Sequence, residues 1–273
     1  MLSHFKFLAL LVSLILTSFF SLAAQENKTS EKPKKAEKQK QQNTDLSKNA
    51  TADQVAESVI FVFGGGGGRA NLQQIRRTAI ERGRLNITNA DGTTEQASYE
   101  KRILRGDNLE KERIRVDQEF PTAKYALIYN DNKVSGLFNE SVFTPREDAS
   151  KAFQNQLWHG IEALLRYKEN GATLELAKRE KFMNVEYFVL DVTDKQSRKT
   201  RFFISAKSFR VMWLEYTQDA IKYTRRFYDY RYAQGTLVPY RTVLLANDKQ
   251  IEETTISTVT FGQKLEEDVF LAG

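Results

Sequence analysis

The alternation of apolar and polar residues constrains this chain more than any other feature of its sequence. From Thr78 the pattern has period two, and it continues, with one helical interruption, to about residue 261. The turns between the alternating segments are short, as at residues 89–92 and 130–132. Short connections favour antiparallel neighbours, because parallel strands need long crossovers. The pattern predicts strands at about 78–88, 95–105, 109–119, 124–130, 133–139, 172–180, 182–192, 199–205, 209–217, 220–232, 236–246 and 250–261.

A single strong amphipathic helix is predicted within this run of strands. Thr144-Pro145-Arg146-Glu147 combines an N-cap threonine, a proline at the first helical position and a glutamate that closes a capping box. Asn170-Gly171 ends the helix, which we expect from Pro145 to Arg166. Helical spacing places an apolar stripe on one face, formed by Phe153, Leu157, Ile161, Leu164 and Leu165.

Together these elements predict an α+β fold. A sheet of this length has to curl, because strand twist accumulates. The helix must then cover an apolar face of the curled sheet. We therefore expect an incomplete, unclosed antiparallel β-barrel of about 11 strands with a helical lid. Such an architecture encloses a cavity suited to apolar ligands.

The residues before the strands predict two short helices joined by glycines. Thr51 and Gln54 have the spacing of a capping box, and apolar residues then follow at helical spacing to Phe63. Gly64–Gly68 ends this helix, and a second helix is expected from Asn71 to about Arg77. The glycine run is followed by Arg-Ala and not by Lys and Ser or Thr, so a phosphate-binding loop is disfavoured.

The N-terminal residues indicate export. Lys6 precedes an apolar run from Phe7 to Phe20, and small residues at Ser21 and Ala23 suit a signal peptidase. We expect a cleaved signal peptide over residues 1–23 and a periplasmic location; the alternative is an uncleaved anchor. Residues 24–52 are rich in Lys, Gln and Glu and predict a disordered linker, either a solvated spacer or a segment that touches anionic lipid. One domain should occupy residues 53–273.

Cysteine content and charge exclude several classes of function. The chain has no cysteine, which excludes disulfides, thiolate metal sites, cysteine nucleophiles and a lipid-modified N-terminal cysteine. From Asp53 onward there are 33 basic and 31 acidic residues, because 8 of the 41 basic and 4 of the 35 acidic residues precede that position. This near neutrality gives no basic patch, so nucleic acid is not an expected partner.

The order of elements resembles the periplasmic lipoprotein-carrier family typified by LolA and its outer-membrane lipoprotein-sorting relatives. Four local patterns carry the resemblance and together span most of residues 55–270. They are Gly64-Gly65 with Leu72, Ile75 and Gly83; Phe203 to Val211; Phe227 to Arg231 with Gly235 and Pro239-Tyr240-Arg241; and Thr255 to Val259 with Leu265 and Asp268-Val269-Phe270.

The resemblance implies an incomplete barrel of antiparallel strands, interrupted by lid helices, that carries lipoproteins. Two departures limit what it implies about function. The Arg-Pro … Phe-Arg-Trp signature of the carriers has no counterpart here, and Ser205-Ala206 stands where relatives have Asp-Pro. No cargo-binding residue is therefore transferred from the family.

Apolar residues of the helix and of the later strands are the candidate ligand-binding residues. The strands of the second half are rich in aromatic side chains, which either fill a closed core or line a cavity under the lid. The sequence does not separate these two readings. Taking the second, we expect the ligand-binding set to be Phe153, Leu157, Ile161, Leu165, Tyr187, Val189, Phe203 and Trp213.

Catalysis is not expected. His159 is the one histidine outside the predicted signal peptide, and its place on the helix indicates a surface residue. The acid pairs Glu110/Glu112, Glu252-Glu253 and Glu266-Glu267 lie near turns or on strands and are typical of solvated charge. The basic, aromatic stretch of residues 222–232 fits the outer wall of a barrel better than a nucleic-acid site. No metal or cofactor is expected.

The sequence therefore predicts a periplasmic binding or carrier protein for lipoproteins or other acyl-chain ligands. The expected partners are lipoprotein acyl chains or lipid, with membrane-associated export or receptor proteins as further candidates. The alternative is a periplasmic interaction or sensor domain that recognises a partner protein through its sheet, without ligand transport.

Overall fold

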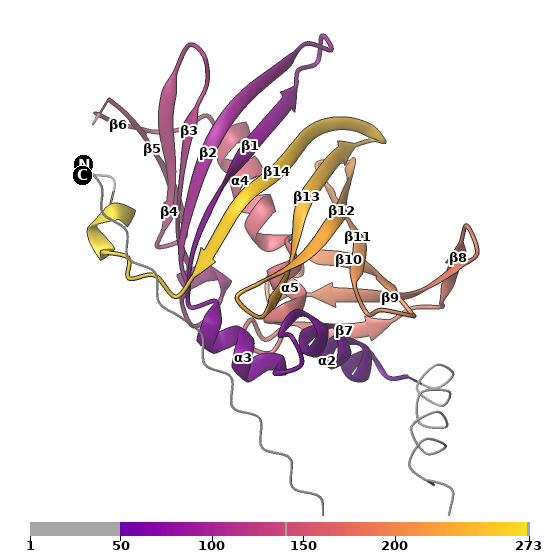
Figure 1. Cartoon of the computed structure of the whole chain (residues 1–273). Helices are drawn as coiled ribbons and strands as arrows, with labels where there is room; N and C mark the ends of the chain where they lie inside the picture. Colours follow the sequence, from indigo (N-terminus) through magenta and orange to yellow (C-terminus); the bar gives the residue numbers. More distant parts are fainter. Residues whose placement is uncertain (1–49, 140, 272–273) are drawn as a thin grey trace, which may run out of the picture. The chain divides into compact units, whose positions relative to one another are not determined.

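The computed structural model describes residues 50–139 and 141–271. These residues form one antiparallel sheet of 14 strands in the order β6-β5-β4-β3-β2-β1-β14-β13-β12-β11-β10-β9-β7, with β8 also paired to β9 (Figure 1). The predicted signal peptide and nearly all of the predicted linker lie outside the described residues. The strands are β1 Thr78–Thr88, β2 Thr94–Leu104, β3 Arg113–Glu119, β4 Lys124–Asn130, β5 Lys133–Phe138, β6 Ser141–Phe143, β7 Thr173–Leu176, β8 Glu180–Phe182, β9 Val185–Thr193, β10 Lys199–Ser205, β11 Val211–Gln218, β12 Ile221–Ala233, β13 Thr236–Ala246 and β14 Lys249–Phe261.

The sheet is unclosed, as predicted, but it has 14 strands, two more than the twelve segments with strand patterning. The additional strands β6 and β8 have three residues each, and all of their side chains are exposed. A strand with no buried face carries no alternation for a sequence reading to detect. The predicted strand at 109–119 also begins later, because Asn108 caps a short 3₁₀ helix, Leu109–Lys111, before β3.

Two helices precede the sheet, as the sequence predicts. Helix α2 spans Ala52–Phe63, and its capping box is present: Gln54 N donates to the Thr51 hydroxyl, and Thr51 N donates to the Gln54 side chain. Helix α3 spans Gly68–Ile75 and so begins three residues earlier than expected. The glycines between them form a tight connection, as expected for this run.

A close backbone approach explains one of these glycines. Gly65 has φ of +59°, and a Cβ on it would lie 2.0 Å from the carbonyl oxygen of Gly235. Gly235 lies in the turn between β12 and β13. The helix connection therefore rests directly on a hairpin of the sheet, which only a residue without a side chain permits.

The predicted lid helix is two helices. Helix α4 spans Glu147–Trp158 and α5 spans Ile161–Leu165, with His159 and Gly160 between them. Gly160 is extended, with φ of −86° and ψ of 175°. The predicted capping box at Thr144 is also wrong, because α4 begins after Arg146 and no side chain caps it.

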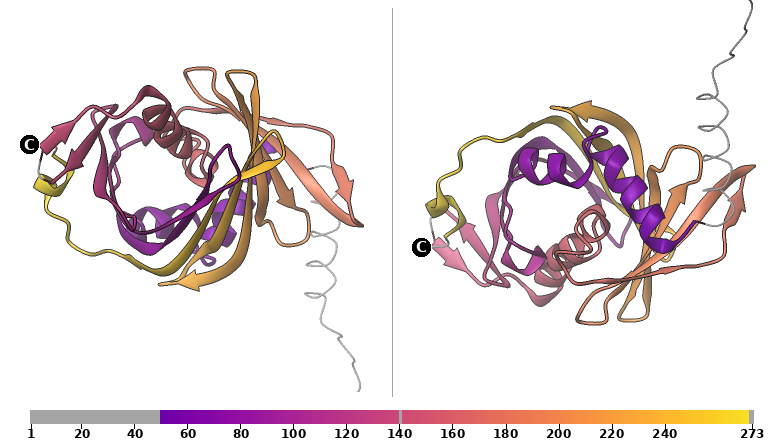
Figure 2. Two further views of the ribbon diagram at one scale, coloured as in Figure 1. Left: turned by 90° about the horizontal axis from the view of Figure 1, so that it is seen from above. Right: turned by 90° about the horizontal axis from the view of Figure 1, so that it is seen from below.

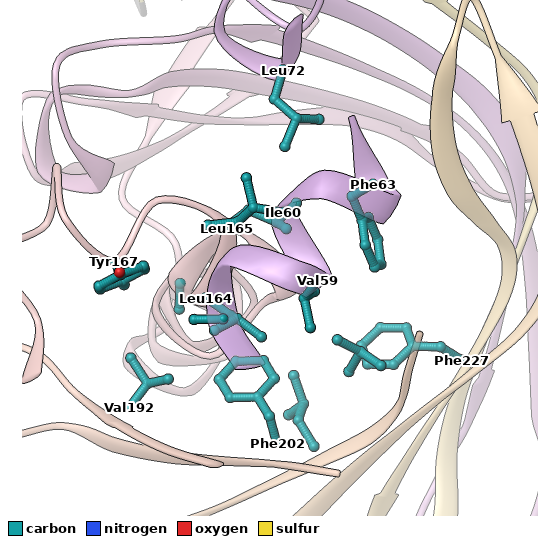
Figure 3. Packing of buried hydrophobic residues seen from close by; sticks show 14 of the residues in the cluster. Val59, Ile60, Phe63, Leu72, Leu164, Leu165, Tyr167, Val192, Phe202 and Phe227 are labelled. Atoms are coloured by element: carbon teal, nitrogen blue, oxygen red, sulfur yellow. The ribbon is translucent and has the colours of Figure 1, made fainter. Parts of the chain in front are cut away.

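The core lies between α2, α5 and the concave face of the sheet. Val59, Ile60 and Phe63 of α2 pack beside Leu164 and Leu165 of α5 (Figure 3). The sheet contributes Val192, Phe202 and Phe227 on the facing side, also shown in Figure 3. These side chains are almost completely buried, and apolar burial is the main stabilising contribution to such a core. Among the described residues, no helix is long and apolar enough to cross a membrane.

Candidate functional site

Helix α4 lies across the opening between the two halves of the curved sheet. Seen end-on, the strands of the first half curve round toward α4, and β11–β13 lie on its other side (Figure 2). Phe153 and Trp158 attach α4 to the first half through Tyr129 of β4, with ring centroids 6.4 and 6.0 Å from the tyrosine. The opposite side of α4 borders an open groove.

This groove, called here the α4 groove, has a volume of about 860 Å³ between α4 and the tips of β1 and β11–β14. Its sheet side is mainly apolar, and charged side chains of α4 stand at its edge. An apolar floor with a few polar groups is the usual make-up of a small-molecule site. The sheet side includes Ile87, Tyr223, Leu244 and Ile251, and the α4 side includes Lys151 and Ala152.

Of two glutamines at the α4 groove, one has a hydrogen-bond partner for its side chain and the other lacks one for its side-chain oxygen. Gln156 Nε2 donates to Glu252 Oε2 over 3.2 Å, which joins α4 to β14. The buried Gln218 Oε1, in contrast, has no hydrogen-bond partner among the described residues. A buried acceptor without a donor is costly, so Gln218 lowers the stability of this end of β11.

A second groove of about 840 Å³ continues from the first along α4. The two share Lys151, Asn155, Tyr216 and Gln218, and the second also includes His159. Tyr216 stacks on His159 at 4.0 Å and on Tyr223 at 5.0 Å between ring centroids. A three-ring stack therefore runs from the break between α4 and α5 to the floor of the α4 groove.

His159 is buried, which corrects the expectation of a surface histidine. Its Nδ1 lies 2.7 Å from the Thr200 hydroxyl, and its ring is covered by Tyr216. Burial, with a further contribution from Arg198, lowers the pKa of His159 to about 4. His159 is the C-cap residue of α4, so it lies at the break between the two helices.

The four predicted ligand-binding residues on the helices lie in or against the core. Leu157 and Leu165 are buried members of the core cluster, whereas Phe153 and Ile161 are half-buried against it. None of the four lines the α4 groove. The stripe therefore anchors α4 and α5 to the protein, and neighbouring residues of α4 face the groove.

The other four predicted residues lie on the opposite face of the sheet. Phe188, Leu190 and Phe202 belong to the core cluster, and side chains alternate along a strand, so their neighbours Tyr187, Val189 and Phe203 point away from it. Trp213 joins them, with ring centroids 4.8 Å from Tyr187 and 4.3 Å from Phe203. The eight predicted residues therefore do not share one cavity.

The sequence reading missed the floor of the α4 groove. Ile87, Leu244 and Ile251 lie near strand ends, where an isolated apolar residue looks like an ordinary strand residue.

The charged candidates are engaged in structural contacts. Glu112 is paired with Arg105 and Arg166, Glu253 with Arg241, and Glu267 with Arg113. In the described part of the chain, no three His, Cys, Asp or Glu side chains gather as a metal site would require.

The basic, aromatic segment lies on β12 and uses both faces of the sheet. Tyr223 and Tyr230 pack against the core, whereas the Tyr228 ring faces the Arg241 guanidinium at 4.9 Å on the other face. The expectation of an outer wall therefore holds for part of this segment and not for all of it.

An unclosed antiparallel sheet with helices on its concave face and a groove at its mouth defines a half-barrel protein. No family model matches the chain, and no curated protein matches it by sequence. Solved structures do match. A LolA superfamily protein from Nitrosomonas europaea is 14% identical, with a TM-score of 0.58, over 82% of this chain and 98% of its own.

Two further structures have the same architecture. An outer membrane lipoprotein-sorting protein domain from Vibrio parahaemolyticus is 15% identical, with a TM-score of 0.51, over 81% of this chain and 97% of its own. A DUF1329 family protein from Desulfovibrio piger is 10% identical, with a TM-score of 0.55, over 81% and 97%. The chain has the LolA-like fold, which confirms the resemblance drawn from its sequence.

Proposed function

We propose that this protein is a periplasmic binding protein that carries an acyl chain or another elongated apolar ligand in the α4 groove. The observation that carries the proposal is the groove itself: an open space of about 860 Å³ with an apolar floor at the mouth of a LolA-like half-barrel. This volume lies within the range of small-ligand sites, about 300–1,000 Å³. Residues 1–23, read as a signal peptide, support the periplasmic location.

Physical chemistry favours an acyl chain over a compact polar ligand. Each methylene moved from water into the groove contributes about 0.8 kcal/mol, so a long chain gains affinity from floor residues such as Leu244 and Ile251 without specific contacts. The charged side chains at the edge, among them Arg146 and Lys151, would stay in water beside a polar headgroup. Lipoprotein acyl chains are one source of such a ligand, and free lipids are another.

Binding is favoured over catalysis by the state of the charged groups. Glu112, Glu253 and Glu267 are held in ion pairs, and the buried His159 forms a hydrogen bond with Thr200. Glu252, at the edge of the groove, accepts a hydrogen bond from Gln156. The groove floor itself offers apolar atoms and ring faces, which can hold a ligand but do not activate one.

A groove-filling variant tests the proposal. Ala152 is exposed on α4 and lines the groove, so Ala152→Trp should fill it without disturbing the core. Ala149 is exposed on the same helix and does not line the groove, so Ala149→Trp is the matched control. Binding of a fluorescent C16 fatty-acid probe should fall at least tenfold in Ala152→Trp and stay unchanged in Ala149→Trp.

Two results would contradict acyl-chain binding in the groove. One is probe binding that Ala152→Trp leaves as strong as in the wild type. The other is no probe binding by the wild-type protein together with no lipid in mass spectra of its organic extract.

A second candidate function, recognition of a partner protein, is favoured by one feature of the sheet. Phe182, Met183 and Val185 form the tip of the β8–β9 hairpin and are 58%, 82% and 41% exposed. Apolar side chains gathered at an exposed tip are typical of interaction sites. Triple substitution by serine should abolish capture of any specific partner while leaving fatty-acid binding intact.

A further inference from the structure

A second pocket, separate from the α4 groove, lies where α3, α5 and the β2–β3 connection meet. Its volume is about 360 Å³, and it shares no lining residue with the α4 groove. Five arginines line it: Arg69, Arg76, Arg77, Arg105 and Arg166. Five guanidinium groups around one small space repel one another unless negative charges lie close to them.

Three of these arginines form one chain of ion pairs with two carboxylates. Glu162 lies 3.0 Å from Arg76 and 2.9 Å from Arg105, and Glu112 lies 2.8 Å from Arg105 and also contacts Arg166. The five side chains are between 0% and 22% exposed. Three guanidinium groups against two carboxylates leave this network with a charge of +1.

The remaining charged groups at the pocket do not supply the missing anion. Glu169 is bound by Arg69, which also pairs with Glu57, and Glu57 pairs in turn with Lys168, so these two cations and two carboxylates balance. Arg77 and Asp107 are exposed at the rim and have no ion-pair partner among the described residues, so their charges offset each other. The excess positive charge therefore stays with the buried network.

Hydrogen bonding in the network is incomplete as well. The Nε–H groups of Arg76 and Arg105 are buried and have no acceptor in the part of the chain that the structure describes. A buried charge without a partner, and a buried donor without an acceptor, each destabilise a protein. Arginine forks match the oxygens of phosphate and carboxylate groups.

We propose that this pocket binds an anionic group, of the phosphate class, whose charge completes the network of Arg76, Arg105 and Arg166. The volume admits a phosphate together with a small organic group, and Leu72 and Leu165 provide an apolar wall for the latter. A phosphorylated small molecule and a phospholipid headgroup present the same chemistry. The site is independent of acyl-chain binding in the α4 groove, because the two share no residue.

Rim variants test the site without disturbing the buried network. Wild-type unfolding temperature and calorimetric titration should show saturable binding of inorganic phosphate, beyond the effect of sodium chloride at equal ionic strength. Arg77→Gln should weaken phosphate binding about fivefold, and Asp107→Asn should strengthen it, because each changes one exposed charge at the rim. Arg84→Gln, an exposed arginine of β1 outside the pocket, should leave it unchanged.

Each outcome decides the proposal. Phosphate binding that responds equally to Arg77→Gln and Arg84→Gln, or stabilisation that chloride reproduces, overturns it. Tighter binding of dihexanoyl phosphatidic acid than of phosphate, lost in Arg77→Gln, assigns the pocket to a lipid headgroup. Equal binding of the two assigns it to a free phosphate compound. Displacement of the fatty-acid probe by inorganic phosphate would contradict the separation of the two sites.

Discussion

The imidazole of His159 lies flat against the phenol ring of Tyr216, with the ring centroids 4.0 Å apart and the planes 1° from parallel. The contact fixes the break between α4 and α5 to the sheet, and the hydrogen bond to Thr200 reinforces it. Because burial lowers the pKa of His159 to about 4, from an ordinary value of 6.5, the folded protein holds the neutral ring. Arg198 and Arg225 lower this pKa further, whereas Asp194 raises it.

Acidification should therefore destabilise the protein through His159. A folded pKa below the unfolded one means that the stabilisation is present above pH 6.5 and is lost as the pH falls toward 4. The free energy of unfolding should fall by about 2 kcal/mol between pH 7.5 and pH 5 from this residue. Urea unfolding of the wild type and of His159→Gln at both pH values checks this, since the difference isolates one titration. Equal pH dependence in the two proteins would contradict it.

Leu157→Ala should be strongly destabilising. The sequence reading placed Leu157 in an open cavity, where the loss would be about 1 kcal/mol. In the structure this side chain is 7% exposed within the core cluster, so its removal leaves a void and should cost about 2–5 kcal/mol. Ile161 is half-buried, and Ile161→Ala should cost less. Chemical denaturation measures both, and the reverse ranking would contradict this packing.

Substitutions of Gly65 and Gly68 distinguish the cost of backbone strain from the cost of a steric clash. Gly65 and Gly68 both have φ of +59°, but a Cβ on Gly68 meets nothing within 4 Å, whereas one on Gly65 would lie 2.0 Å from the Gly235 carbonyl. Gly68→Ala should cost about 1 kcal/mol, from the left-handed conformation alone. Gly65→Ala should cost clearly more, because backbone atoms must move. Thermal unfolding compares them, and equal losses would show that the connection does not press on the β12–β13 turn.

The mature protein should begin at Ala24. Ser21 and Ala23 are the small residues at the positions that signal peptidase reads. N-terminal sequencing of the protein from a periplasmic fraction gives the answer directly. A terminus at Met1 or Leu2 would identify the apolar segment as a membrane anchor.

Local sequence patterns predicted the strands well, but they did not predict contacts between residues far apart in the chain. The strands at 124–130, 199–205 and 236–246 have the predicted bounds, because alternation and turn residues are local signals. Neither Thr144 nor the helical stripe revealed the break between α4 and α5, although Gly160 is a local helix-breaking residue at that position.

The candidate site was harder to predict because both faces of the sheet carry large apolar side chains at β9 and β10, and only Asp191 and Arg201 mark one of them as the outer face. Residues Tyr187 to Val192 are all buried, so apolar character alone does not distinguish the two alternate sets. Tyr187 and Phe188 are equally good candidates by composition, and only the packed structure places them on opposite faces. The same ambiguity at β10 explains why Phe203 was predicted to face the helices, although Phe202 is the residue that packs in the core.

The strand order has a consequence for how the chain is made. Strands β1 to β6 pair in sequence, and so do β9 to β14, whereas the bond between β1 and β14 joins opposite ends of the domain. Because the other strands of the described sheet lie between β1 and β14 in the chain, β1 keeps one unpaired edge until the second half of the sheet has folded. An unpaired edge is one that strands of other molecules can join. Formation of the β1–β14 seam therefore protects the folding chain against aggregation through this edge.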